Sequence, residues 1–113
     1  MSAPFIIGIG GTTRPGSSSE QALQVALAHA RKLGAETQLF GGAELQMPMY
    51  DPATANDHEA ARTFIAACRR ADGVIMASPC YHGAVSGLVK NALDYTEEMN
   101  KDARVYFDGR AIG

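Results

Sequence analysis

The stretch "PFIIGIGGTTRPGSSSEQAL", residues 4–23, decides the fold class because its apolar residues change period within a short distance. Its first part, "PFIIGIG" (residues 4–10), is an apolar run with isoleucines on both faces, which is typical of a strand buried on both sides in a parallel sheet. From Ser18 to Leu33 the apolar residues fall instead on one helical stripe, made of Leu23, Ala26, Leu27, Ala30 and Leu33. Gly34 stands where a left-handed helix cap is expected. The stretch therefore predicts a strand, a glycine-rich loop and a helix.

Two further strand and helix pairs follow. "AETQLF" (residues 35–40) predicts a second strand, and a loop rich in Gly, Pro, Asp and Asn (residues 41–56) comes after it. Asn56 and Glu59 predict a capping box for a second helix, whose core stripe is Ala61, Phe64, Ile65, Cys68 and Ala71. "GVIMAS" (residues 73–78) predicts a third buried strand. A third helix then carries an apolar face made of Leu88, Ala92, Tyr95, Thr96 and Met99.

Strands that alternate with helices in this way predict an α/β fold with a doubly wound parallel sheet and helices on both faces. Ligands of such sheets bind beyond the carboxyl ends of the strands, where the strand order reverses, and two turn-rich loops (residues 10–19 and 78–87) follow predicted strands here. "RVYFDGRAIG" (residues 104–113) predicts a loop that leads into a fourth strand. A three-stranded sheet would leave an open apolar edge. We therefore expect that the sequence stops at the start of strand four, or that another segment supplies the edge.

Composition narrows the function classes. A chain of 113 residues with 46% hydrophobic content suits one domain, residues 1–113, around a single core. The formal charge of −2 argues against sequence-independent nucleic-acid binding and favours a small ligand or a protein partner. Cys68 and Cys80 form neither a CxxC pair nor a disulfide framework, which points to a reducing compartment. We expect a cytoplasmic protein without a targeting segment or a membrane span.

The first loop has the composition of an anion cradle. "GGTTRPGSSSEQAL" (residues 10–23) offers glycine amides, threonine and serine hydroxyls, the guanidinium of Arg14 and the positive end of a helix dipole. The chain has no Gly-Lys-Ser/Thr ending of a Walker A loop, and "GIGGTT" has Thr13 where the third glycine of a dinucleotide fingerprint belongs. A terminal monophosphate, as in FMN, suits the loop better. The alternative is simple capping of the helix by Ser17 or Ser18, with Glu20 or Gln21 completing a capping box.

The second loop, "SPCYHGAVSGLVKNALDY" (residues 78–95), suits a flat ring. Pro79 fixes the chain as it leaves the third strand, and Gly83 and Gly87 allow close backbone approach, so a planar heteroaromatic ring can lie against the amides of Tyr81, His82 and Gly83. Together with "GGTTRPGSSS" and "LQMPMYDP", in this order and spacing, the stretch resembles the NAD(P)H-dependent FMN reductase family of flavodoxin-like flavoproteins. The resemblance spans almost the whole chain.

This resemblance implies a flavodoxin-like oxidoreductase that passes hydride from NAD(P)H to FMN and on to a small acceptor such as free flavin, a quinone or an azo compound. It implies that Thr12, Arg14, Ser17 and Ser19 hold the FMN phosphate, and that Pro79, Cys80, Tyr81, His82 and Gly83 line the isoalloxazine. The pair Lys90 and Asn91, with Asp94, would be structural. A homodimer or homotetramer with flavin sites at subunit contacts is also implied, as is a five-stranded sheet of which this sequence lacks the last strands.

Other interpretations of single residues stay open or carry less weight. Cys80 and His82 are too few ligands for zinc, so no metal site is expected, and Cys80 lacks an arguable base, which favours packing over nucleophilic catalysis. His82 is either a donor to the flavin or a surface residue, and Met47 and Met49 line a pocket or fill the core. No catalytic acid or base is assigned. The alternative functions are an electron carrier that does not use nicotinamide, which Arg14 and the small net charge disfavour, and a non-catalytic fragment of the fold.

Overall fold

The computed structural model describes residues 2–113, and it has the strands and helices in the order that the sequence predicts. The strands are β1 (Phe5–Gly10), β2 (Glu36–Phe40), β3 (Gly73–Ala77) and β4 (Ala111–Ile112). The helices are α1 (Ser18–Lys32), α2 (Glu59–Arg70) and α3 (Gly87–Tyr95), with short 3-10 helices η1 (Ala55–Asp57), η2 (Tyr81–Gly83) and η3 (Thr96–Met99).

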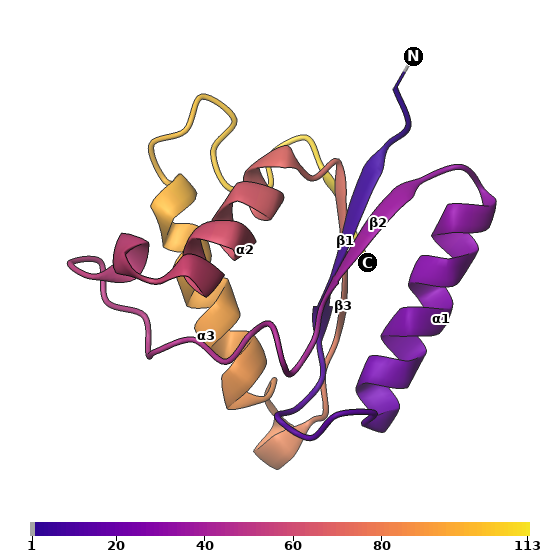
Figure 1. Ribbon diagram of the computed structural model, residues 1–113, viewed down its shortest axis with the longest axis horizontal. Coiled ribbons are helices and arrows are strands. Elements are labelled where there is room, and N and C mark those ends of the chain that lie inside the picture. The colour runs from indigo at the N-terminus through magenta and orange to yellow at the C-terminus, as the bar shows by residue number, and fades with distance from the viewer. Residues whose placement is uncertain (1) are drawn as a thin grey trace.

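All strand pairs are parallel, and the strand order is β2-β1-β3-β4. Helix α1 covers one face of the sheet, whereas α2 and α3 cover the other (Figure 1). This confirms the predicted α/β class and doubly wound flavodoxin-like sheet. The order also places the reversal between β1 and β3, because the chain moves from β1 to β2 on one side and continues with β3 on the other.

The main core lies between the sheet and the α2 and α3 layer. All five residues of the predicted α2 stripe are at most 2% exposed, and the ring of Phe64 meets that of Phe40 edge to face with 5.2 Å between centroids. On the other face, Leu23 and Leu27 of α1 are buried against the sheet. The predicted stripe of α1 is wrong at its last member, Leu33, which is 78% exposed. The helix ends at Lys32, so the chain turns before Leu33 can reach the sheet.

The structure confirms the cap predicted at the end of α1 but not the cap predicted at the start of α2. Gly34 has φ of 99° and follows α1 as predicted, with the amide of Ala35 donating to the carbonyl of Ala30 at 3.1 Å, the bond of a Schellman motif. The capping box of Asn56 and Glu59 is wrong. Helix α2 begins at Glu59 after an extended His58, whose side chain makes no capping bond. The side chain of Asn56 donates instead to Glu98, at 3.2 Å, because this segment forms its own 3-10 turn.

The predicted fourth strand is present and covers part of the β3 edge. Gly73 and Val74 pair with Ala111 and Ile112, and the amide of Met76 donates to the carbonyl of Gly113 at 2.9 Å. The apolar third strand is therefore an inner strand over most of its length, as the argument against an open edge requires.

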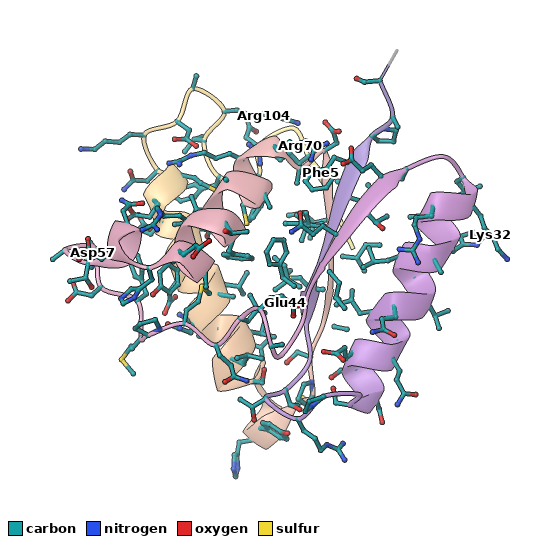
Figure 2. All side chains as sticks on the ribbon, in the orientation of Figure 1. Phe5, Lys32, Glu44, Asp57, Arg70 and Arg104 are labelled. Atoms are coloured by element: carbon teal, nitrogen blue, oxygen red, sulfur yellow. The ribbon has the colours of Figure 1, made fainter. Side chains whose placement is uncertain are left out.

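Side chains occupy the end of the sheet where β1 begins. The guanidinium of Arg70 lies 4.0 Å from the centre of the Phe5 ring and pairs with the carboxylate of Glu36 (Figure 2). The two turn-rich loops lie at the opposite end, which is the lower end in Figure 1. The carboxyl ends of the strands thus carry the candidate site.

Candidate functional site

The first loop leaves β1 at the reversal point of the sheet and is ordered by hydroxyl groups. Thr12 Oγ1 accepts from the amide of Arg14 at 3.1 Å, and Ser17 Oγ accepts from the amide of Glu20 at 3.3 Å. Ser17 is buried and is the N-cap of α1, so the capping interpretation is correct for this residue. In the described part of the chain, other backbone amides next to Ser17 stay unpaired although Ser17 caps the helix. Within residues 2–113, the amides of Ser18 and Ser19 have no acceptor, as expected for the first turn of a helix.

Arg14 is the only basic side chain on this loop, and it is exposed. Within the part of the chain that the structure describes, its guanidinium forms no ion pair and no hydrogen bond. The charge is therefore free to meet an anion, and its planar fork suits the paired oxygens of a phosphate or carboxylate.

Glu20, in the first turn of α1, joins this loop to the one that follows β2. One carboxylate oxygen accepts from the amide of Gly16 at 3.1 Å, and the other accepts from the amide of Gly42 at 3.2 Å. A Cβ at Gly42 would lie 2.1 Å from the carbonyl oxygen of Thr12, so only glycine fits there. The backbone at Gly42, after β2, therefore packs directly against the backbone of the first loop.

Two serines, Ser78 and Ser86, bond the two ends of the second loop to each other. The amide of Ser86 donates to Ser78 Oγ at 2.8 Å, and Ser86 Oγ, which also caps α3, donates to the carbonyl of Gly11 at 3.2 Å. The amide of Gly11 in turn donates to the carbonyl of Ala77 at 3.0 Å. The two loops are therefore bonded directly to each other, although 75 residues separate Ser86 from Gly11.

The tip of the second loop is a tight turn. Its 3-10 helix η2 contains His82 in the left-handed region, with φ of 52°, followed by Gly83 with φ of 80°. The amide of Gly83 donates to the carbonyl of Cys80 at 3.3 Å, so it is not the free donor that the sequence suggested. The amides of Tyr81 and His82 have no acceptor among residues 2–113 and face solvent or a ligand.

A cavity of about 420 Å³ lies between the two loops. It is lined by Thr12, Arg14, Ser17, Ser18, Ser19, Ser78, Pro79 and Tyr81. A smaller cavity of about 220 Å³ shares Ser78 and Pro79 with it and adds Cys80, Gly83, Ala84 and Val85. The two cavities therefore have a common wall, and together they extend from the hydroxyls of the first loop to the tip of the second.

These cavities bring together most of the residues predicted for cofactor binding. The larger cavity is lined by Thr12, Arg14, Ser17 and Ser19 of the first loop and by Tyr81. Cys80 and Gly83 line the smaller cavity, and Pro79 lines both. His82 lines neither, because the left-handed turn directs the chain away at this residue. The roles of all nine residues in binding stay predictions.

Sequence reasoning missed Ser78, Ser86 and the side chain of Glu20 as parts of this arrangement. Ser86 precedes an apolar helix, which is a detectable N-cap signal, but nothing local indicates that its hydroxyl reaches Gly11. The sequence indicates Glu20 only as a capping-box residue, because its bond to Gly42 spans 22 positions.

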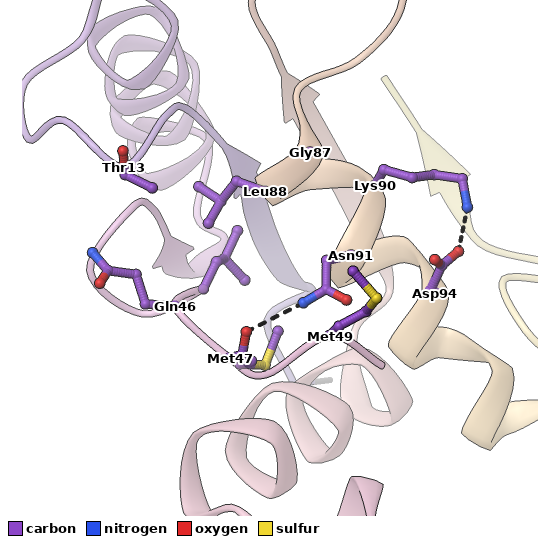
Figure 3. Close-up of a pocket in the computed structure, with 10 residues that line it drawn as sticks. Thr13, Gln46, Met47, Met49, Gly87, Leu88, Lys90, Asn91 and Asp94 are labelled. Atoms are coloured by element: carbon purple, nitrogen blue, oxygen red, sulfur yellow. Dashed lines mark hydrogen bonds and ion pairs between the residues drawn. The ribbon is translucent and has the colours of Figure 1, made fainter. Parts of the chain in front are cut away.

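A further cavity, of about 630 Å³, lies beside the first loop, between residues 45–49 and the first turns of α3 (Figure 3). Leu45, Met47, Met49 and Leu88 supply its apolar wall, so both methionines line a pocket, and Met47 also packs against the core. Its polar residues are largely satisfied. Asn91 accepts from the amide of Tyr50 at 2.8 Å and donates to the carbonyl of Pro48 at 3.0 Å, while Lys90 pairs with Asp94.

Asn91 thus fixes residues 47–50, which belong to the loop after β2, to α3. Tyr95 helps, since its hydroxyl donates to the carbonyl of Pro48 at 2.8 Å. The Tyr50 hydroxyl donates to Glu98 at 2.7 Å, and this bond, with burial and the surrounding carboxylates, raises the pKa of Tyr50 to about 12. Asn91 and Tyr95 of α3 and Glu98 of η3 therefore bond residues 48–50 beside this cavity to the helical layer.

The cysteines have contrasting environments. Cys68 is buried in α2, and desolvation raises the pKa of its thiol to about 12, so it is an inert packing residue. Cys80 is exposed on the second loop. Among residues 2–113 no cluster of His, Cys, Asp or Glu is placed to hold a metal ion. No helix in the same residues is long and apolar enough to cross a membrane.

Chemically, the arrangement offers amide, hydroxyl and guanidinium donors at one end and a proline, an aromatic side chain and exposed amides at the other. Such donors suit a phosphate ester, and the second loop suits a flat ring. Among the described residues of the two loops, no hydrogen bond pairs two carboxylates or joins a nucleophile to a basic side chain.

Comparisons with known proteins point in the same direction. The family model described as NADPH-dependent FMN reductase matches residues 4–112. An NADPH azoreductase of Bacillus sp. (strain OY1-2) is 38% identical over 61 residues, which are 53% of this chain and 34% of that protein.

Solved structures with the same fold include the apo form of an NADH:FMN oxidoreductase, with a TM-score of 0.71 and 23% identity over 97% of this chain and 56% of the other. The flavoenzyme NAD(P)H:(acceptor) oxidoreductase of Paracoccus denitrificans has a TM-score of 0.73 and 17% identity, over 97% of this chain and 58% of the other. The azoreductase of Bacillus anthracis str. Sterne has a TM-score of 0.61 and 12% identity, over 81% and 54%. The chain spans a third to somewhat more than half of the length of these proteins.

Proposed function

The chain belongs to the NADPH-dependent FMN reductase family, and we propose that it binds FMN across its two loops and transfers hydride from NAD(P)H through the flavin to a small acceptor. The observation that carries the proposal is the direct bonding of the two loops, which places phosphate donors and a ring platform around two adjacent cavities that share Ser78 and Pro79. A mononucleotide with a phosphate at one end and a tricyclic ring at the other matches that pair.

The residues present fit FMN by their donor chemistry. The free guanidinium of Arg14, the hydroxyls of Thr12, Ser17 and Ser19 and the unpaired amides at the start of α1 would hold the phosphate. Pro79, Cys80, Tyr81 and Gly83 would line the ring, with the free amides of Tyr81 and His82 near its polar edge. When bound, the flavin supplies the hydride chemistry.

The protein's own contribution is binding and orientation. Arg14 neutralises part of the phosphate charge, while the rigid stem of the second loop fixes the platform on which a ring rests. No side chain of the two loops needs to move a proton. His82 lies outside both cavities, which favours a surface role for its side chain over a catalytic one.

The acceptor class is a finer proposal. Free flavin, a quinone and an azo compound are the candidates, and the similarity to an NADPH azoreductase supports the last of these. That similarity covers 34% of the azoreductase, so acceptor specificity has to be measured on this protein. Assembly as a homodimer or homotetramer and a cytoplasmic location are proposals of the same standing.

The deciding experiment is an absorbance scan of the purified protein with added FMN, followed by anaerobic addition of NADPH. We expect a bound flavin spectrum that bleaches on NADPH addition and recovers when an acceptor is supplied. A protein that binds FMN but responds to neither NADPH nor NADH would be an electron carrier. A protein that takes up no FMN would contradict the proposal and support the hypothesis of a non-catalytic module with the same fold.

A further inference from the structure

We propose that Glu20 is a positioning residue that gives the first loop its phosphate-binding shape and so makes the protein prefer FMN over riboflavin. This inference rests on the proposed function and deepens it, because it names the residue that sets selection for a phosphorylated flavin. Glu20 lines neither the cavity between the two loops nor the smaller cavity of the second loop. It bonds instead to the backbone amide of Gly16, which directly precedes the cavity residue Ser17, and to that of Gly42.

The carboxylate of Glu20 is a clamp between two chain segments. Its Oε2 accepts from the amide of Gly16 at 3.1 Å, and its Oε1 accepts from the amide of Gly42 at 3.2 Å. Gly16 directly precedes Ser17, whose hydroxyl lines the cavity, and Gly42 belongs to the loop after β2. Hydrogen bonds to an ionised acceptor are roughly twice as strong as neutral ones. The clamp therefore ties the phosphate loop to the loop that directly follows β2.

Close packing makes the clamp geometrically strict. A Cβ at Gly41 would lie 2.3 Å from Oε1 of Glu20, and a Cβ at Gly42 would lie 2.1 Å from the carbonyl oxygen of Thr12. The glycine pair thus lets the backbone approach both the carboxylate and the first loop. Loss of the carboxylate would release residues 12–16 from this support, and Arg14 lies in the middle of them.

Helix capping alone does not explain this arrangement. Ser17 already caps α1 by accepting from the amide of Glu20. In a capping box the side chain of Glu20 would reach back to the amide of Ser17, but it reaches Gly16 and Gly42 instead. The bond to Gly42 adds nothing to the helix. This bond instead holds the start of α1, and with it the first loop, against the loop after β2.

The test compares the affinities of FMN and riboflavin, measured by quenching of flavin fluorescence in the full chain. Riboflavin lacks only the phosphate, so a defect in the phosphate loop affects FMN alone. We expect Glu20→Ala to raise the dissociation constant of FMN by about tenfold or more, as the loss of charge-assisted support predicts, and that of riboflavin by less than about twofold. Glu20→Gln, which keeps one acceptor oxygen, should fall between the wild type and Glu20→Ala.

Glu44→Ala is the matched control. The carboxylate of Glu44 accepts from the amide of Gly41 at 3.0 Å, in the same glycine pair, but makes no bond to the first loop. We expect this variant to bind both flavins as the wild type does. Hydrogen exchange in the protein without flavin gives a second readout, since Glu20→Ala should accelerate exchange at Gly16 and Gly42, and Glu44→Ala at Gly41 only.

Each outcome bears on the inference separately from the proposed function. A wild type that binds neither flavin overturns the proposed function. A wild type that prefers FMN, with an unchanged preference in Glu20→Ala, overturns the positioning role alone. Equal weakening of both flavins by Glu20→Ala also overturns it, because that result shows a general structural role.

Discussion

The two loops at the carboxyl end of the sheet are stabilised in opposite ways. The first is braced along its length by side chains, with Thr12, Ser17 and Glu20 each accepting a bond from a backbone amide. Side chains stabilise the second loop only at its two ends, through Ser78 and Ser86. Its tip is stabilised by short backbone turns instead. A loop that must present many donors to a compact anion needs a fixed backbone throughout. A platform for a flat ring needs a fixed base and an open surface.

The largest expected effect tests the dependence of the first loop on its neighbour. Gly42→Ala would place a Cβ 2.1 Å from the carbonyl oxygen of Thr12, and neither backbone can yield easily. We expect the free energy of unfolding to fall by about 3 kcal/mol, the upper end for overpacking. Gly83→Ala, at the tip of the second loop, has no atom within 4 Å of the new Cβ and should cost only about 1 kcal/mol through its φ of 80°. Urea unfolding of both variants measures the difference, and equal losses would remove the contrast between the loops.

The second prediction separates binding from stability on the first loop. Arg14→Ala removes an exposed charge without a partner among the described residues, so the free energy of unfolding should change by less than about 0.5 kcal/mol. The affinity for FMN should fall by about 1.5–3 kcal/mol, the range for hydrogen bonds to charged groups.

Arg31→Ala is the control for Arg14→Ala, because Arg31 lies in the last turn of α1, far from the first loop, and bonds only to Thr37. Titration calorimetry with FMN should give the wild-type affinity for this variant. An Arg14→Ala protein with the same affinity would remove Arg14 from the site.

A smaller effect is expected at the link between the loops. Ser86→Ala loses both the cap of α3 and the bond to Gly11, whereas Ser17→Ala loses the cap of α1 and a contact with Ser19 on its own loop. We expect losses of about 2 and about 1 kcal/mol respectively in urea unfolding. If both variants lost the same free energy of unfolding, the hydrogen bond from Ser86 to Gly11 would contribute nothing to stability.

Much of this architecture is predictable from sequence, and the exceptions share one physical cause. Apolar periodicity and the glycine after α1 depend on near neighbours, so the helices, the buried strands and the motif around Gly34 could be predicted. The bonds from Glu20 to Gly42 and from Ser86 to Gly11 depend on which strands become adjacent, and no local pattern encodes them. The capping box at Asn56 failed for the same reason, since Glu98 is a distant competitor for that side chain.

The smallest effect concerns the segment of residues 47–50, which serves as a reference outside both loops. The pKa of Tyr50 is raised to about 12, so its stabilising contribution is complete below pH 10 and is lost as the pH rises from 10 towards 12. Tyr50→Phe should lower stability slightly at neutral pH and show a shallower decline between pH 10 and 12 than the wild type. Chemical denaturation across that range measures the difference. A parallel decline would mean that the bond to Glu98 does not hold the neutral phenol.

The arrangement of parallel strands has one more consequence. Helices α1 and α3 both begin at the carboxyl end of the sheet, and their capping residues Ser17 and Ser86 lie on the two bonded loops. Their amino-terminal partial charges therefore add to the positive potential of Arg14, which the carboxylate of Glu20 offsets in part, on a chain with a net charge of −2. Such a potential attracts an approaching anion over about 10 Å at 0.1 M ionic strength. The rate of anion capture should consequently fall as salt is added, while the shape of the loops stays the same.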